Sequence, residues 1–263
     1  MTVRQMFYRL VTLSQIAKTE SEYKHTVIRL LGAMRLEGDI PFDWIADNTR
    51  WQRKPRSYDS VQAMLKETAR LYRRNLWMNQ CDYVEIWLEK EALAGVLFGV
   101  TAQYDVPLMV TRGYASLSFL SGAAEAIAAQ GKPAYIYYFG DHDPSGHDIM
   151  RNVERRLTEF APEAEIHFQC VAVTSEQIEA MHLPTRPTKQ SDSRAKHFRG
   201  GSVEVDAIPS QALRDLATAS IERHLDERQL AVLETAEASE RTWLHKLAKQ
   251  GVPQSLRQAR LDS

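Results

Sequence analysis

Two aspartates, Asp141 and Asp143, stand just after the short apolar and aromatic run Pro133–Phe139. This run is typical of a buried strand, and the residues from Pro144 onward have helical spacing. In extended backbone, side chains two residues apart point to the same side. Two carboxylates aimed at one point repel each other unless a cation lies between them, and Mg²⁺ takes a few carboxylate oxygens plus waters. The pair therefore predicts a site for a hard metal ion.

A third acid, Glu89, follows the strand-like run Asp82–Leu88 and precedes the helical segment Ala92–Tyr104. Successive strand–helix units form a parallel sheet, and ligands gather beyond the carboxyl ends of its strands. We therefore expect Glu89 to reach the same edge of the sheet as Asp141 and Asp143.

The sequence resembles the Toprim domain over about Asp82 to Val173. The shared pattern is a glutamate at the end of one strand and an Asp-x-Asp at the end of a later strand. Topoisomerases, bacterial primases and several nucleases share that domain. The resemblance implies that Glu89, Asp141 and Asp143 hold Mg²⁺. The alternation of predicted elements independently favours a doubly wound parallel sheet. The predicted strands are Asp82–Leu88, Pro107–Val110, Pro133–Phe139 and Glu165–Val173, and the helices between them are Ala92–Tyr104, Ala115–Gln130 and Ser145–Phe160.

Near the start of the chain, Arg4 and Tyr8 lie four residues apart in a predicted helix, Thr2–Ser14, and so share one face. A tyrosine can attack a DNA phosphodiester when its phenol is deprotonated or hydrogen-bonded and cations offset the phosphate charge. Arg4 and a nearby Mg²⁺ would meet both needs. The alternative is that Tyr8 is a half-buried core aromatic, since Phe7 and Leu10 flank it.

The order of three motifs along the chain resembles that in the A subunit of topoisomerase VI and in the related meiotic double-strand-break protein. The motifs are Arg4–Tyr8 (RQMFY), Glu89-Lys90 and Asp141–Gly146 (DHDPSG). The resemblance covers most of residues 2–175. In that family the tyrosine becomes joined to a DNA 5′ end. The resemblance thus implies that Tyr8 is the nucleophile, with Arg4 and Glu89 as further catalytic residues. It also implies a homodimer in which each tyrosine faces the partner's metal ion.

Strand passage would require a separate ATPase subunit. The sequence has no Gly-x-x-x-x-Gly-Lys-Ser/Thr motif, because Gly131-Lys132-Pro133 lacks both the preceding glycine and the hydroxyl residue. Cleavage alone would need no such partner.

Residues 1–58 are predicted to form a winged-helix-like DNA-binding module. Predicted helices at Thr2–Ser14 and Thr19–Met34 precede the basic, aromatic stretch Ile40–Arg56. Ten Lys and Arg face six acids in residues 1–56, which suits a phosphate backbone. The alternative is a plain helical subdomain with a solvated basic face. The residues expected to contact DNA here are Arg50, Arg53 and Lys54.

The remaining divisions are a connecting helix in 59–80, the Toprim domain over 81–175, and a C-terminal extension over 176–263. The extension begins with a basic loop, Pro184–Gly201, in which Lys189 and Arg194 are expected to bind DNA. A short predicted strand, Val203–Ala207, carries Glu204 and Asp206 on one face, which would make either an auxiliary acid site or a solvated surface. Two helices follow, Pro209–His224 and Glu227–Lys249.

Composition is ordinary for a globular protein, with 263 residues, 44% hydrophobic and 25% charged. The net charge of −1 means that any nucleic-acid surface must be local. Cys81 and Cys170 lack zinc-ligand spacing and give no disulfide framework, which favours a reducing interior. No apolar run is long enough to span a bilayer. We therefore expect a cytoplasmic, nucleoid-associated protein with double-stranded DNA, not a membrane, as its partner.

These patterns together predict Mg²⁺-dependent DNA cleavage, with tyrosine transesterification to a DNA 5′ end. One alternative is a hydrolytic Toprim nuclease, as in some anti-plasmid or anti-phage systems, where water replaces Tyr8. Another is a DNA-binding protein without catalysis, whose acids are structural. Asp143, for example, stands before Pro144, where it would cap a helix.

Overall fold

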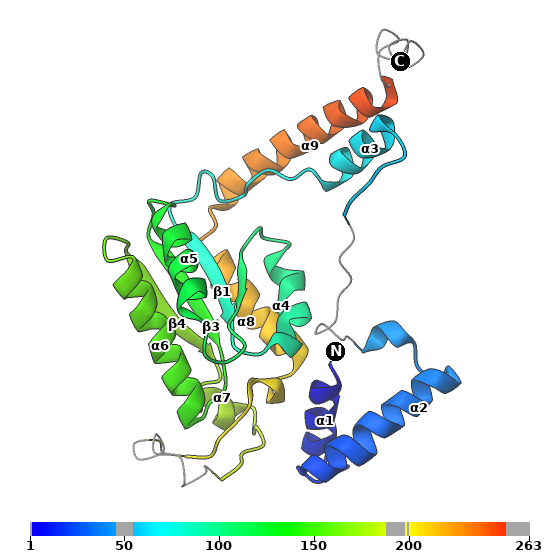
Figure 1. Cartoon of the computed structure of the whole chain (residues 1–263), viewed down its shortest axis with the longest axis vertical. Helices are drawn as coiled ribbons and strands as arrows, with labels where there is room; N and C mark the ends of the chain where they lie inside the picture. Colours follow the sequence, from blue (N-terminus) through cyan, green and yellow to red (C-terminus); the bar gives the residue numbers. More distant parts are fainter. Residues whose placement is uncertain (1, 46–54, 188–197, 199, 251–263) are drawn as a thin grey trace. The chain divides into compact units, whose positions relative to one another are not determined.

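A four-stranded, all-parallel sheet forms the core of the larger of two units in the computed structural model (Figure 1). The structure describes residues 2–45, 55–187, 198 and 200–250. The strand order is β2–β1–β3–β4, which confirms the predicted α/β class with a parallel sheet. The strands are β1 Tyr83–Leu88, β2 Leu108–Val110, β3 Ala134–Phe139 and β4 Ile166–Ala172.

The two central strands, β1 and β3, are buried along nearly their whole length, as expected where helices cover both faces of a parallel sheet. They pair in register, with Leu88 opposite Phe139, so they end side by side. The chain positions that follow them, beginning with Glu89 and Gly140, therefore leave the sheet at the same edge.

Helices cover both faces of this sheet (Figure 1). On one face, Leu120 and Ile127 of α5 and Val153 and Leu157 of α6 pack around Trp87 of β1. On the other face, the Tyr137 hydroxyl lies 2.6 Å from Nε2 of His224, just after α8. The helices of this region are α4 Ala94–Thr101, α5 Leu117–Ala128, α6 Pro144–Phe160, α7 Ser175–Ala180 and α8 Ser210–Glu222.

The N-terminal helices belong to the same unit as the sheet, which comprises Met1–Arg50 and Cys81–His224. They are α1 Val3–Thr12, a π-helical turn at Glu22–Ile28 and α2 Arg29–Glu37, and a 3₁₀ turn follows at Phe42–Trp44. Gly38 ends α2 with a left-handed φ of +85°. The winged-helix character of this module stays a prediction, because residues 46–54 lie outside the described ranges.

The second unit joins Trp51–Gln80 to Leu225–Ser263. Its helices α3, Val61–Leu71, and α9, Glu227–Gln250, lie side by side although they are far apart in the sequence (Figure 1). The Tyr72 hydroxyl donates to Glu240 Oε2 at 2.7 Å, and Arg241 Nε donates to the carbonyl of Tyr72 at 2.8 Å. This grouping joins segments that the predicted domain division keeps apart.

The predicted strand at Val203–Ala207 is wrong. Val203 makes only an isolated bridge with His142, and Val205–Ala207 forms a 3₁₀ turn. The turn is held by its polar contacts, because the Val205 amide donates to Asp141 Oδ1 at 2.8 Å and Asp206 forms an ion pair with Lys90. None of the helices in the described ranges is both long and apolar enough to cross a membrane.

Candidate active site

Glu89 and Asp141 meet at the carboxyl edge of the sheet, as the sequence predicts. Glu89 Oε2 accepts a hydrogen bond from the Asp141 amide at 3.1 Å. The Glu89 side chain is mostly buried, with 9% of the residue exposed. Burial, and then the nearby Asp141 carboxylate, raise the pKa of Glu89 to about 7. A negative charge on this carboxylate is therefore unfavourable unless a cation stands beside it.

Asp143 lies at the same edge but has a second role. Its Oδ1 accepts from the Gly146 amide at 2.7 Å, so it caps α6, with Pro144 at the first helical position. Its charge still contributes to the raised pKa of Glu89, after burial and Asp141. In the part of the chain that the structure describes, no three His, Cys, Asp or Glu side chains are arranged to hold a metal ion among them.

Two glycines allow the acids to come this close. A Cβ on Gly140 would lie 2.4 Å from Tyr138 Cε1 and 2.8 Å from Glu89 Oε2. A Cβ on Gly146 would lie 2.2 Å from the Asp141 carbonyl oxygen. Side chains at these positions would push the turn after β3 away from Glu89. Close approach of the backbone thus explains both glycines.

Lys90 lies among three acids next to this pair. Its Nζ is 3.0 Å from Asp141 Oδ2, 2.9 Å from Glu204 Oε2 and 2.9 Å from Asp206 Oδ2. Burial opposes its charge, but Asp141 and Asp206 outweigh burial and raise the pKa of Lys90. The two acids that the sequence offered as an auxiliary site thus contact Lys90. This ammonium group holds the Asp141 carboxylate in a fixed orientation.

Tyr8 lies near enough to this cluster for the charges of Lys90 and Asp206 to act on it, and it is buried, with 1% of the residue exposed. Its hydroxyl accepts a hydrogen bond from Arg186 Nη2 at 3.0 Å, and Lys18 Nζ lies 5.3 Å from the centre of its ring. Burial raises the pKa of the Tyr8 phenol, although Arg186, Lys90 and Arg4 pull it the other way. The burial of Tyr8 therefore agrees with the alternative of a core aromatic. Its cationic neighbours agree with the catalytic role.

The arginines that approach Tyr8 both reach Glu204. Arg4 Nε lies 3.8 Å from Glu204 Oε2, and its guanidinium group stacks on Tyr23 at 4.7 Å. Arg186 also forms an ion pair with Glu204. The sequence did not single out Arg186, because it is one of many cations in a loop identified only by composition. Its isolated bridge with Ser202 places it here.

The other expected DNA contacts cannot be placed in this site. Arg50, Arg53, Lys54, Lys189 and Arg194 all lie outside the described residues, so their roles stay predictions.

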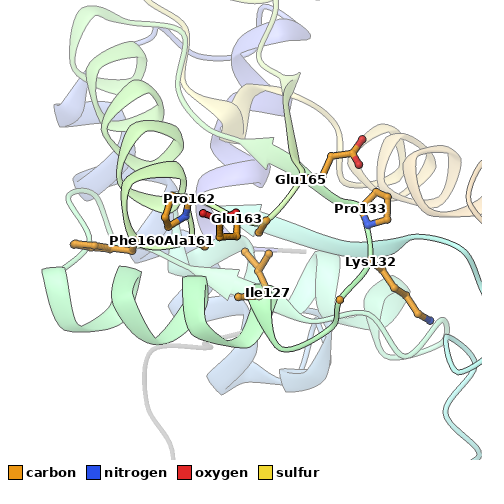
Figure 2. Close-up of a pocket in the computed structure, with 11 residues that line it drawn as sticks. Ile127, Lys132, Pro133, Phe160, Ala161, Pro162, Glu163 and Glu165 are labelled. Carbon is orange, nitrogen blue, oxygen red and sulfur yellow. The ribbon is translucent and has the colours of Figure 1, made fainter.

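A cavity of about 440 Å³ lies at the opposite edge of the sheet (Figure 2). Ile127, Phe160 and Pro162 form part of its wall, where α5 and α6 both end. The carboxyl ends of two helices carry partial negative charge, which disfavours phosphate. This cavity is also at the far ends of β1 and β3 from Glu89 and Asp141. It is therefore a poorer candidate for chemistry on nucleic acid.

No protein-family model matches this chain, and no curated protein matches it either. The functional conclusion therefore depends on the residues and their geometry.

Proposed function

We propose that this chain is a Mg²⁺-dependent enzyme that cleaves DNA phosphodiesters at a Toprim-type site and is related to the A subunit of topoisomerase VI. The observation that carries the proposal is the convergence of Glu89 and Asp141. They come from strands separated by some fifty residues and meet in a hydrogen bond of 3.1 Å. Burial and then the nearby Asp141 carboxylate raise the pKa of Glu89 to about 7, so a cation beside the two acids would be favoured.

A magnesium ion that keeps most of its waters would be held beside Glu89 and Asp141, whose Oδ1 and Oδ2 also contact the Val205 amide and the Lys90 ammonium group. Mg²⁺ is commonly held by one or two carboxylates, so Glu89 and Asp141 would suffice, with Asp143 as the third acid implied by the Toprim resemblance. When bound, Mg²⁺ would offset charge on the phosphate and on the departing oxygen. Lys90 keeps Asp141 oriented toward this edge through their 3.0 Å ion pair.

The burial of Tyr8 favours water as the nucleophile. A phenol that is 1% exposed, with a pKa raised by burial, is neither accessible to DNA nor readily deprotonated. In the hydrolytic reading, Lys90, Arg4 and Arg186 would hold a DNA phosphate by exchanging their ion pairs with Asp141 and Glu204 for contacts with it. Tyr8 then supports Arg186 through the hydrogen bond between them.

Tyrosine transesterification is the second candidate, and one contact favours it. Arg186 donates directly to the Tyr8 hydroxyl, and such a bond stabilises a phenolate. This route requires Tyr8 to become exposed, since its attack on DNA would otherwise be blocked. The expected homodimer, in which the tyrosine faces the partner's metal ion, belongs to this candidate.

The test is cleavage of supercoiled plasmid with Mg²⁺, followed by denaturation with and without protease. We expect the wild type to cut, and Glu89→Gln and Asp141→Asn to cut about 100-fold more slowly or worse. Glu163→Gln is the matched control, because Glu163 lines the cavity at the other edge of the sheet. Cleavage by Asp141→Asn at the wild-type rate would overturn the proposal, and DNA binding without any cutting would leave the non-catalytic alternative.

Tyr8→Phe decides between the two chemistries. Hydrolysis predicts that this variant still cuts and that no protein remains on the DNA ends. Transesterification predicts a protease-sensitive adduct on the 5′ ends of the cut DNA. In that case Tyr8→Phe would lose both the adduct and the cleavage.

A further inference from the structure

A second cavity, of about 370 Å³, lies between α1 and the start of α8, beside the acid cluster. Asp206 lines this cavity and also lies 2.9 Å from Lys90. The cavity therefore adjoins the candidate active site, although none of the reactions considered above uses it.

Two buried groups on its wall that can donate a hydrogen bond have no partner in the part of the chain that the structure describes. Gln5 is 5% exposed, and its Oε1 accepts from the Thr2 amide at 3.1 Å, which fixes Nε2 as the remaining group. Gln5 Nε2 and Ser210 Oγ are both buried without a hydrogen-bond partner among the described residues. Leaving a buried donor unpaired is costly, so these groups indicate a missing acceptor.

The amino end of α8 faces the same cavity. This helix has 13 residues, and the residue before it, Pro209, provides no side-chain cap. The first amide groups of a helix have no acceptor within it, and they carry the positive end of the helix dipole. Such an end favours an anion.

Two arginines complete the wall. Arg9 on α1 and Arg214 on α8 both line the cavity. The acid that faces them, Asp206, already has a cation in Lys90, 2.9 Å away. Apart from Asp206 Oδ1, which is also buried without a partner on this wall, the groups left to bind a ligand can all donate: two guanidinium groups, an amide, a hydroxyl and a helix amino end.

We propose that this cavity binds a phosphate group. Guanidinium groups recognise phosphate oxygens in pairs of hydrogen bonds, and helix amino ends bind the same oxygens. The phosphate could come from the DNA backbone or from a free phosphate ester such as a nucleotide. The first source rests on the proposed function, because it would seat the substrate beside Glu89 and Asp141, whereas the second does not.

Binding to the full-length chain tests this. Sodium phosphate, thymidine 5′-monophosphate and a short labelled DNA duplex are each titrated against wild type, Arg9→Gln, Arg214→Gln and Ser210→Ala. We expect each arginine variant to bind its phosphate ligand about tenfold more weakly or worse, and Ser210→Ala to lose a smaller factor. Arg155→Gln is the control, since Arg155 is exposed on α6 and already paired with Glu159. Thermal unfolding confirms that each variant is folded.

The pattern of losses identifies the source of the phosphate. Weaker binding of phosphate and nucleotide with unchanged duplex affinity supports a free phosphate ester, whereas a parallel loss of duplex affinity supports the DNA backbone. If no ligand binds saturably, or if Arg9→Gln and Arg214→Gln bind as Arg155→Gln does, the proposal is overturned. Its failure is separable from that of the proposed function, because Asp141→Asn should lose cleavage and keep phosphate binding.

Discussion

Glu89 is the residue on which the candidate site depends most, because its carboxylate is buried next to another acid. Its pKa rises from an ordinary value of 4.5 to about 7, through burial first and Asp141 second. Between these pH values the folded chain binds a proton that the unfolded chain has released. The contribution of this proton to stability is therefore fully present below pH 4.5 and is lost as the pH rises through about 7.

We therefore expect Glu89→Gln to be more stable than the wild type above pH 7 in the absence of Mg²⁺, by at most about 3 kcal/mol. Well below pH 7 the two should differ little, because the wild-type carboxyl is then neutral. Adding Mg²⁺ above pH 7 should raise the stability of the wild type and not that of the variant. The measurement is the free energy of unfolding in urea across this pH range.

Glu163→Gln serves as the control, because Glu163 is exposed at the other edge of the sheet. If Glu89→Gln and the wild type gave parallel stability curves, the assignment of a raised pKa to Glu89 would be wrong.

At the scale of elements, the turn from β3 into α6 positions the acids. The Gly146 amide, in the first turn of α6, donates to Asp143 Oδ1 at 2.7 Å. A Cβ on Gly146 would lie only 2.2 Å from the Asp141 carbonyl oxygen. An alanine there must displace the turn. The cap on α6 and the contact between Glu89 and Asp141 would then be disturbed together.

Gly146→Ala is accordingly expected to lose about 1–3 kcal/mol of stability, the usual cost of overpacking, and to lose DNA cleavage. Gly122→Ala is the matched control, since Gly122 lies within α5 and nothing occupies the space around its Cβ position. That change should stabilise the chain by about 0.5–1 kcal/mol, because alanine favours a helix over glycine. Urea unfolding of both variants measures this, and equal stabilities would refute the steric argument.

Elements with local patterns could be predicted from the sequence, and those made by distant contacts could not. The apolar run Pro133–Phe139 indicated β3, and Asp143-Pro144 indicated the start of α6, because each pattern is complete within a few residues. Val203–Ala207 alternates like a strand, but its contacts with Asp141 and Lys90 make it a turn. No local pattern could reveal those partners, since they lie some 60 and 110 residues away.

At the scale of the whole molecule, the same limit applies to the candidate site. The shared edge of β1 and β3 follows from the rule for parallel sheets, so the meeting of Glu89 with Asp141 could be predicted. Arg186 and Glu204 come from late in the chain and reach α1 through tertiary packing. The helical pair α3 and α9 was also missed, because neither helix carries a motif that specifies the other.

The division into two units makes a prediction about unfolding. The larger unit has a core in which Leu157 of α6 is fully buried. Among residues 55–80 and 225–250 of the smaller unit few side chains are buried, and Leu233 of α9 is one of them, at 2% exposed. Units with separate cores can unfold separately, and the one that buries less apolar surface should unfold first.

We expect two thermal transitions by calorimetry. Leu233→Ala should lower the temperature of the first transition only, and Leu157→Ala that of the second only. Each substitution leaves a cavity that costs about 2–5 kcal/mol in its own core. The two variants are matched in chemistry, so each serves as the control for the other. A single transition that both variants shift equally would mean that the chain unfolds as one cooperative unit. In that case a destabilising substitution in α9 would also unfold the part of the chain that holds Glu89 and Asp141. Variants of α9 would then lower DNA cleavage near the melting temperature.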